Sequence, residues 1–221
     1  MSASPVQVDM VSDFVCPWCW LGYAQYAEAA RTALPPPELT FRPYMLDPSV
    51  PDEGQDYRAY MQAKFGEGSA DRFKASREHL LREGEALGIH FDFDAITRRP
   101  NSLNAHRVLK WAQGQSSAKA HLVASGIFRA YHERGRDIGD TDVLVEIAEN
   151  AELDGALVRE LLAGQNDKLE IMQEVQFFRG LGVSGVPTFI YEGQLAVQGA
   201  QEPEKHRRAF KQAARLSAQN S

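Results

Sequence analysis

The sequence predicts an α/β fold in which a small sheet, formed from both ends of the chain, is interrupted by a long helical insertion. Strand patterns occur near the ends, at residues 6–11, 39–46, 186–191 and 195–198. Between about residues 48 and 166 the apolar side chains recur almost entirely at helical spacing. Strands of one sheet should therefore come from both ends of the chain.

The first strand and the first helix follow from local patterns. Val6, Val8 and Met10 share one face of a strand because side chains alternate with a period of two. The Ala-rich stretch from Leu21 to Thr32 favours a helix, and Pro17 suits its first turn because proline has a preset φ and needs no intrahelical donor. The helix should end near residue 34, before three consecutive prolines.

The second strand carries an internal proline, Pro43, which predicts an edge position or a bulge. One further short strand is expected at residues 89–91. Further along the chain, Thr141 or Asp140 can cap the helix that carries Val143, Leu144, Ile147 and Ala148. The helices expected in the insertion span residues 55–65, 70–87, 103–113, 118–133, 141–150 and 155–163.

After the insertion, a helix at residues 168–181 ends in a glycine-rich loop, and two strands form a hairpin across Glu192-Gly193-Gln194. An amphipathic helix at 203–216 closes the chain. We therefore expect a discontinuous domain at residues 1–47 and 167–221, with an inserted helical domain at 48–166.

Composition excludes several classes of protein. The chain has 221 residues, of which 43% are hydrophobic and 24% charged, and its net charge is −6. Phosphate binding needs a basic face, so no nucleic-acid partner is expected. The first twenty residues contain neither Lys nor Arg and no sustained apolar run, which predicts no secretory signal, no membrane partner and a cytoplasmic location.

The only two cysteines, Cys16 and Cys19, lie two residues apart where the first strand passes into the first helix. The positive end of the helix macrodipole favours the thiolate of Cys16, so Cys16 is the expected nucleophile. Cys19 lies one turn further in and should be less exposed. It is placed to attack a mixed disulfide and release the product, as a resolving thiol does.

Two other uses of the cysteines remain open. A structural zinc site usually needs four Cys or His ligands. The chain has no second CxxC motif, and its six histidines form no H-x₃₋₅-H pair, so no metal is expected. A fixed structural disulfide is the second alternative, although a loop this short adds little stability to a long chain.

Asp13 precedes the pair closely enough to accept the proton that Cys19 must lose, as a general base would. It is a candidate proton relay. The ordinary alternative is a turn or helix-start residue whose carboxylate satisfies backbone N–H groups.

Cys16-Pro17-Trp18-Cys19 after a strand, with Gly185-Val186-Pro187-Thr188-Phe189 far downstream, resembles the DsbA family of the thioredoxin fold. More narrowly, the chain is similar to the FrnE-like branch, which is related to 2-hydroxychromene-2-carboxylate isomerases and kappa-class glutathione transferases. The similarity covers nearly the whole chain, through Ser12-Asp13, Asn101-Ser102, Ala105-His106-Arg107, Ala130-Tyr131 and Gly199-Ala200-Gln201.

The resemblance implies a thioredoxin-like fold with a large all-helical insertion and a cis Pro187. Val186 would then present its backbone to an extended peptide or to glutathione. Without the resemblance, a trans proline at a strand start is the ordinary expectation. Residues implied to contact substrate are Pro17, Trp18, Val186, Pro187, Asn101 and His106.

Each of the polar and aromatic candidates has a structural alternative. Ser102 can cap the helix that begins after it, and His106 can be a core histidine. Trp18 and Trp20 are more simply packing residues.

The function expected from these features is thiol-disulfide exchange by an enzyme acting on protein or glutathione-like thiols and disulfides. No cofactor should be required, and glutathione is a candidate co-substrate. One alternative is a glutathione-dependent isomerase, although those isomerases commonly carry Ser at the position of Cys16 and lack the second cysteine. A non-enzymatic redox sensor is another. Family membership does not fix the direction of electron flow, because cytosolic thiols are kept reduced whereas periplasmic relatives act as oxidants.

Overall fold

The computed structural model describes residues 4–66 and 70–219, and the chain forms two compact units. Unit 1 comprises residues 1–44 and 173–221, and unit 2 comprises residues 45–172. Helix α8 (Lys168–Gly180) begins in unit 2 and ends in unit 1. The domain boundaries expected from the sequence, at residues 47 and 167, stay a prediction, because compactness alone does not test whether a part folds independently.

Unit 1 contains a four-stranded sheet in the order β2-β1-β5-β6. Strand β1 (Gln7–Ser12) pairs in parallel with β2 (Glu38–Pro43) and antiparallel with β5 (Thr188–Tyr191), which pairs antiparallel with β6 (Leu195–Gln198). The expectation that strands of one sheet come from both chain ends is confirmed, and the sheet is mixed. Pro43 lies at the end of the edge strand β2, where a missing N–H costs no ladder hydrogen bond.

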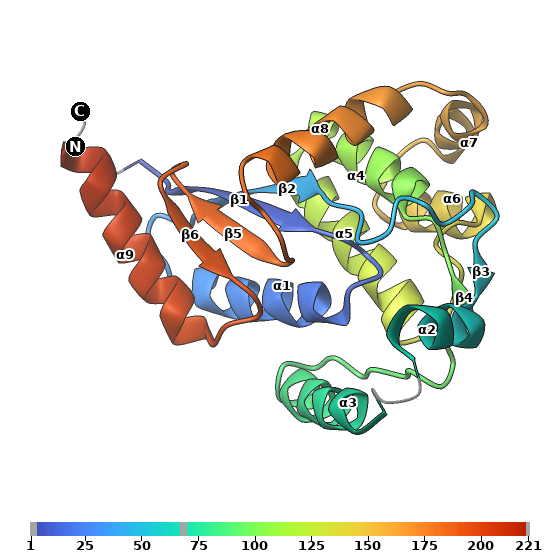
Figure 1. The fold of residues 1–221 in the computed structure, drawn as a ribbon. Coiled ribbons are helices and arrows are strands. Elements are labelled where there is room, and N and C mark those ends of the chain that lie inside the picture. Colours follow the sequence, from blue (N-terminus) through green and yellow to red (C-terminus); the bar gives the residue numbers. More distant parts are fainter. Residues whose placement is uncertain (1–3, 67–69, 220–221) are drawn as a thin grey trace. The chain divides into compact units, whose positions relative to one another are not determined.

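Aromatic side chains hold two helices against one face of this sheet. Tyr26 of α1 (Pro17–Ala30) stacks on Phe189 at a centroid distance of 5.5 Å, and Tyr191 meets Phe210 of α9 (Pro203–Gln219) at 5.8 Å. On the other face, Val11 packs with Tyr44 and with Phe178 of α8. Figure 1 shows α1 and α8 on opposite sides of the sheet. The sheet core is therefore covered on both faces near Val11.

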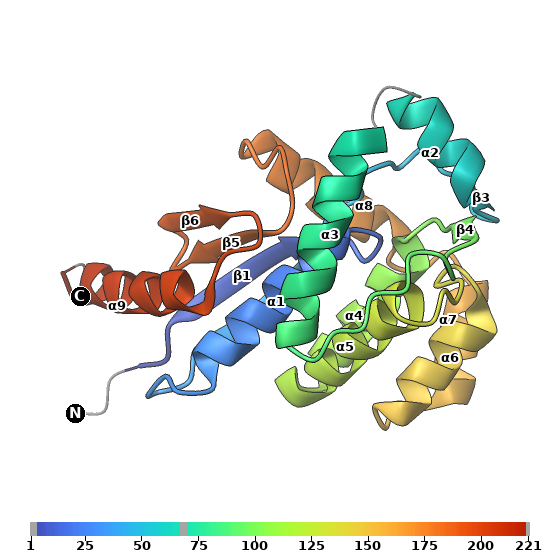
Figure 2. The ribbon, with the colours of Figure 1, turned by 90° about the horizontal axis from the view of Figure 1, so that it is seen from below.

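Unit 2 is built mainly of helices. Helices α4 (Leu103–Gln115), α5 (Ser117–His132), α6 (Thr141–Asn150) and α7 (Gly155–Ala163) pack against one another (Figure 2). Their apolar stripes form the core, in which Val108, Val123, Ile127, Phe128 and Leu144 are fully buried. The remaining elements of this unit are β3 (Gln55–Asp56), α2 (Tyr57–Phe65), α3 (Ala70–Ala86) and β4 (Arg98–Arg99).

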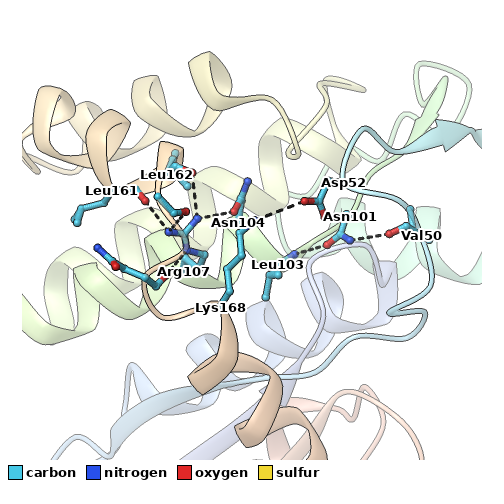
Figure 3. A network of polar contacts seen from close by, with 11 residues as sticks. Val50, Asp52, Asn101, Leu103, Asn104, Arg107, Leu161, Leu162 and Lys168 are labelled. Atoms are coloured by element: carbon cyan, nitrogen blue, oxygen red, sulfur yellow. Dashed lines mark hydrogen bonds and ion pairs between the residues drawn. The ribbon is translucent and has the colours of Figure 1, made fainter.

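A buried arginine of α4 forms hydrogen bonds with the backbone at the end of α7 (Figure 3). Arg107 is 0% exposed, and its guanidinium donates to the backbone carbonyls of Leu161 at 2.6 Å, Leu162 at 3.3 Å and Gly164 at 3.1 Å. Its Nε donates to the Asn166 carbonyl at 2.9 Å. The last carbonyls of a helix have no partner within the regular helix, so Arg107 supplies donors to the carbonyls of Leu162 and Gly164, and it adds a second donor to the Leu161 carbonyl, which also accepts from the Gly164 N–H.

The structure corrects three local expectations. Residues 89–91 form no strand, and the short β3–β4 ladder lies instead at residues 55–56 and 98–99. The first helix ends at Ala30, about a turn before the prolines. Ser102 precedes α4, but its side chain makes no capping hydrogen bond within the described residues; Asn101 accepts from the Leu103 N–H at 2.9 Å instead. An Asn side chain reaches two residues ahead in this way at many turns.

Candidate active site

Cys16 occupies the N-cap position of α1, with extended backbone angles of φ −95° and ψ 113°. Pro17 is the first residue of the helix, as the sequence predicts. Because the N-cap lies at the positive end of the macrodipole, an anion at this position is stabilised. Cys16 is 5% exposed, and its carbonyl already accepts the first turn's hydrogen bond from the N–H of Cys19 at 3.0 Å.

Cys19 lies one turn into the helix and is fully buried, so the expected difference in exposure is present. Burial raises the pKa of the Cys19 thiol well above its usual value, and the hydrogen bond with the side chain of Cys16 and the charge of Cys16 raise it further. Both cysteines are free thiols in this structure. Cys19 therefore holds its proton more tightly than an ordinary thiol.

The loop before β5 brings a backbone carbonyl to the first thiol. The Val186-Pro187 peptide bond is cis, as the resemblance implies. The thiol of Cys16 donates to the carbonyl oxygen of Val186 at 3.7 Å. This loop is fixed on both sides, because the Pro187 carbonyl accepts from the N–H of Gly199 at 2.7 Å and the Thr188 hydroxyl donates to the Gly185 carbonyl at 2.8 Å.

Gly22 is a site residue that the sequence reasoning missed. A Cβ atom at this position of α1 would lie 2.8 Å from Cγ of Pro187 and 3.5 Å from Cα of Ala200. Only glycine lets the helix that carries both cysteines approach the cis-proline loop so closely. An isolated glycine within an Ala-rich helix was the available signal.

Asp13 is 1% exposed and lies immediately before the cysteine pair. Its Oδ1 accepts from the Val15 N–H at 3.4 Å, and its carbonyl accepts from the Cys16 N–H at 3.1 Å. The carboxylate thus supports the turn into α1, which is the ordinary role expected for it. Its charge also raises the pKa of Cys19, while a hydrogen bond with the Asp13 backbone lowers it. The relay role stays a prediction.

The remaining candidate residues differ in position. Pro17 and Trp18 are half-buried on α1 beside the two cysteines. Asn101 and His106 belong to unit 2, where both are buried. The amide of Asn101 donates to the Val50 carbonyl at 2.7 Å. Both Asn101 and His106 thus have places inside unit 2, and their contact with substrate stays a prediction.

The described residues also bear on metal binding and on membrane insertion. Residues 4–66 and 70–219 contain no group of three or more His, Cys, Asp or Glu side chains that could hold a metal ion. Across the same residues, no helix is both long and apolar enough to cross a membrane.

Several solved structures have the same fold as this chain. The probable DsbA oxidoreductase SCO1869 from Streptomyces coelicolor is 27% identical, with a TM-score of 0.84 over 94% of this chain and 89% of that one. A 2-hydroxychromene-2-carboxylate isomerase is 17% identical, with a TM-score of 0.71 over 97% and 99%. The cytosolic disulfide reductase DsbM from Pseudomonas aeruginosa, solved with GSH, is 19% identical, with a TM-score of 0.66 over 95% and 99%.

A thiol at a helix N-terminus, a second buried thiol one turn away and a cis-proline carbonyl against the first thiol together form a site suited to thiol chemistry. The family model of the DSBA-like thioredoxin domain matches residues 7–211, and this range includes all of these groups. The chain therefore belongs to the DSBA-like thioredoxin domain family.

Proposed function

We propose that this protein is a thiol-disulfide oxidoreductase that exchanges disulfides through Cys16 and Cys19. The observation that carries the proposal is the asymmetry of the pair. Cys16 lies at the helix N-terminus with its sulfur 3.7 Å from the Val186 carbonyl, whereas Cys19 is fully buried behind it with a raised pKa. One sulfur is suited to attack and the other to hold its proton until it is needed.

In the first step, the thiolate of Cys16 attacks one sulfur of a substrate disulfide. A bond forms between the Cys16 sulfur and that atom, the substrate S–S bond breaks, and the other substrate sulfur leaves as a thiolate that takes a proton. The backbone of Val186 lies beside the thiol, where it can align an extended segment through main-chain hydrogen bonds of the β-augmentation kind.

In the second step, Cys19 loses its proton and attacks the Cys16 sulfur. The mixed disulfide breaks, the second substrate thiol is released, and Cys16 and Cys19 become a disulfide; two electrons have passed from protein to substrate. We assign the carboxylate of Asp13 as the proton acceptor, since it is buried close enough to influence the pKa of Cys19. The reverse sequence oxidises a substrate dithiol.

The proposal also covers the family branch, the location, the cofactor and the co-substrate. We place the protein in the FrnE-like branch and in the cytoplasm, with no required cofactor and with glutathione as the co-substrate that reduces the Cys16–Cys19 disulfide. The solved DsbM structure contains GSH, which supports the last assignment by analogy of fold.

The test compares Cys16→Ser and Cys19→Ser with the unchanged protein in the reduction of a peptide disulfide by glutathione. Cys16→Ser should show no exchange, whereas Cys19→Ser should accumulate a mixed disulfide that non-reducing mass spectrometry detects. Full multiple turnover by Cys19→Ser would show that the dithiol mechanism is wrong. Asp13→Asn should slow release of the mixed disulfide at neutral pH, because the proton acceptor is lost, while leaving the first attack unchanged.

A further inference from the structure

A groove with a volume of about 570 Å³ lies on the face of the unit 1 sheet that α1 does not cover. Side chains alternate along strands, and Asp9, Ile190 and Ala196 are partners in the sheet register, so they emerge on the same face. All three line the groove. The last turns of α8 and the turn after it also line the groove, through Glu174, Phe177, Phe178, Leu181 and Gly182.

The helix wall of the groove is apolar and open to solvent. Phe177 and Leu181 lie one turn apart on the same side of the chain, and they are 59% and 62% exposed. Large apolar side chains this exposed, next to one another in a groove, are characteristic of surfaces that bind a partner. Ile190 adds a partly buried apolar floor.

Part of the groove is acidic. Arg42 donates through Nε to Asp9 at 2.6 Å and through Nη1 to Glu174 at 3.2 Å, so one guanidinium faces two carboxylates. The side chains of Asp9 and Glu174 remain 30% and 26% exposed, and the second oxygen of each lacks a partner among the described residues. The cluster has a net charge of −1, which favours a cationic group on the partner.

The groove borders the loop that reaches the first thiol, because Val183 and Thr188, which line the groove, flank residues 184–187. Val183 lines the groove, and both Val183 and Val186 pack against the Val11–Tyr44–Phe178 cluster. The carbonyl of the same Val186 lies 3.7 Å from the Cys16 sulfur. A chain whose disulfide reaches Cys16 can therefore extend past Val186 along this face of the sheet.

We propose that the groove binds an extended segment of a substrate polypeptide, in which an apolar residue is followed by Lys or Arg, next to the disulfide that Cys16 attacks. The apolar side chain packs on Phe177 and Leu181, and the cation pairs with Asp9 and Glu174. The inference rests on the proposed function and makes it more specific: the favoured substrates are proteins, selected by sequence near the disulfide.

The experiment measures kcat/KM for three substrates with the full chain. Two are peptides that carry the same disulfide, one with a Leu-Lys pair and one with a Ser-Glu pair, each pair placed roughly two to eight residues from the cysteine because an extended chain advances ~3.3 Å per residue. The third is hydroxyethyl disulfide, which has no segment to bind. The variant Phe177→Gln/Leu181→Gln is compared with Leu34→Gln, a control that is 94% exposed in the same unit but does not line the groove.

The unchanged protein should prefer the Leu-Lys peptide by roughly ten-fold, and the double variant should lose that preference, as removal of a central apolar contact usually does. Glu174→Gln should reduce the preference for Lys, whereas Glu204→Gln on α9 should not. Turnover of hydroxyethyl disulfide should be equal in all of these variants.

Equal rates for the two peptides, or an unchanged preference in the double variant, would overturn the inference while leaving the proposed function intact. A change from dimer to monomer in the double variant, measured by sedimentation, would also overturn it, because the groove would then join two copies of this chain. Absence of exchange with hydroxyethyl disulfide in the unchanged protein would instead refute the proposed function.

Discussion

Replacing His206 by Gln should flatten the acid side of the stability profile of unit 1. His206 is fully buried on α9, where its Nδ1 lies 2.5 Å from the hydroxyl oxygen of Tyr191. The ring of Tyr26 packs edge-on at a centroid distance of 5.8 Å. Burial and the charge of Lys205 lower the pKa of His206 to about 4, against the opposing effect of a hydrogen bond with the Gln201 backbone.

The sign follows from which state binds the proton. The imidazole has a pKa of about 6.5 in the unfolded chain and about 4 in the folded one, so the unfolded state takes up a proton first as the pH falls. The contribution to stability is therefore complete above pH ~6.5 and is lost as the pH falls through about 4. The difference corresponds to a loss on the order of 3 kcal/mol in the free energy of unfolding.

Urea unfolding followed by tryptophan fluorescence, at intervals from pH 7 to pH 4, measures this loss. The unchanged protein should lose roughly 2–3 kcal/mol more than His206→Gln over that range, because Gln does not titrate. His90→Gln is the matched control, since His90 is exposed and its removal should leave the profile unchanged. Parallel pH profiles for the protein and His206→Gln would refute the argument from burial.

Three other predictions concern packing and reactivity. Gly22→Ala should push Pro187 away from α1, costing ~1–3 kcal/mol of stability and slowing disulfide exchange. Arg107→Met should lower the free energy of unfolding by roughly 3 kcal/mol, because the carbonyls of Leu162, Gly164 and Asn166 lose the guanidinium as a donor. Brief treatment of the reduced protein with iodoacetamide at pH 7 should modify Cys16 and spare Cys19 until the chain is unfolded, as read by peptide mass spectrometry.

The two substitutions have matched controls. Gly114→Ala adds a methyl group to α4 where nothing lies within 4 Å, and should be neutral or stabilising by up to ~1 kcal/mol. Arg159→Met removes a side chain that is 53% exposed, and should cost less than ~1 kcal/mol. Equal effects in a variant and its control, or alkylation of both cysteines at the same rate, would contradict the reasoning.

The elements that the sequence predicts well are those with strong local signals. Pro17 at the helix start, the Glu192-Gly193-Gln194 turn between β5 and β6, and the apolar stripes of α5 and α6 specify their structures within a few residues. The hairpin is typical, since Glu192 and Gly193 both have positive φ, at 51° and 65°, as a tight turn requires.

The errors arise where distant contacts decide the structure. The apolar stretch at 89–91 resembles a strand, but Ile89 and Phe91 are buried without a strand partner, and Ile89 closes the end of α3 through its N–H bond to the Gly84 carbonyl. The β3–β4 ladder is only two residues long, too short for a periodic signal.

The candidate site shows the same division. The cysteine pair and its order of exposure follow from spacing and helix geometry, and the cis bond at Pro187 follows from family resemblance. The close approach of Gly22 to Pro187 brings together two positions that lie near opposite ends of the chain, and no local pattern encodes it. The groove beside α8 likewise depends on the sheet register.

The reduction potential of the Cys16–Cys19 pair tests the central claim most directly. The protein is equilibrated with glutathione at a series of thiol-to-disulfide ratios, the remaining thiols are alkylated, and the oxidised fraction is measured by mass. We expect one two-electron transition with a midpoint between ~−270 and ~−120 mV, because the helix N-terminus stabilises the Cys16 thiolate and so favours the reduced pair. Failure to form a Cys16–Cys19 disulfide at any ratio would contradict the account.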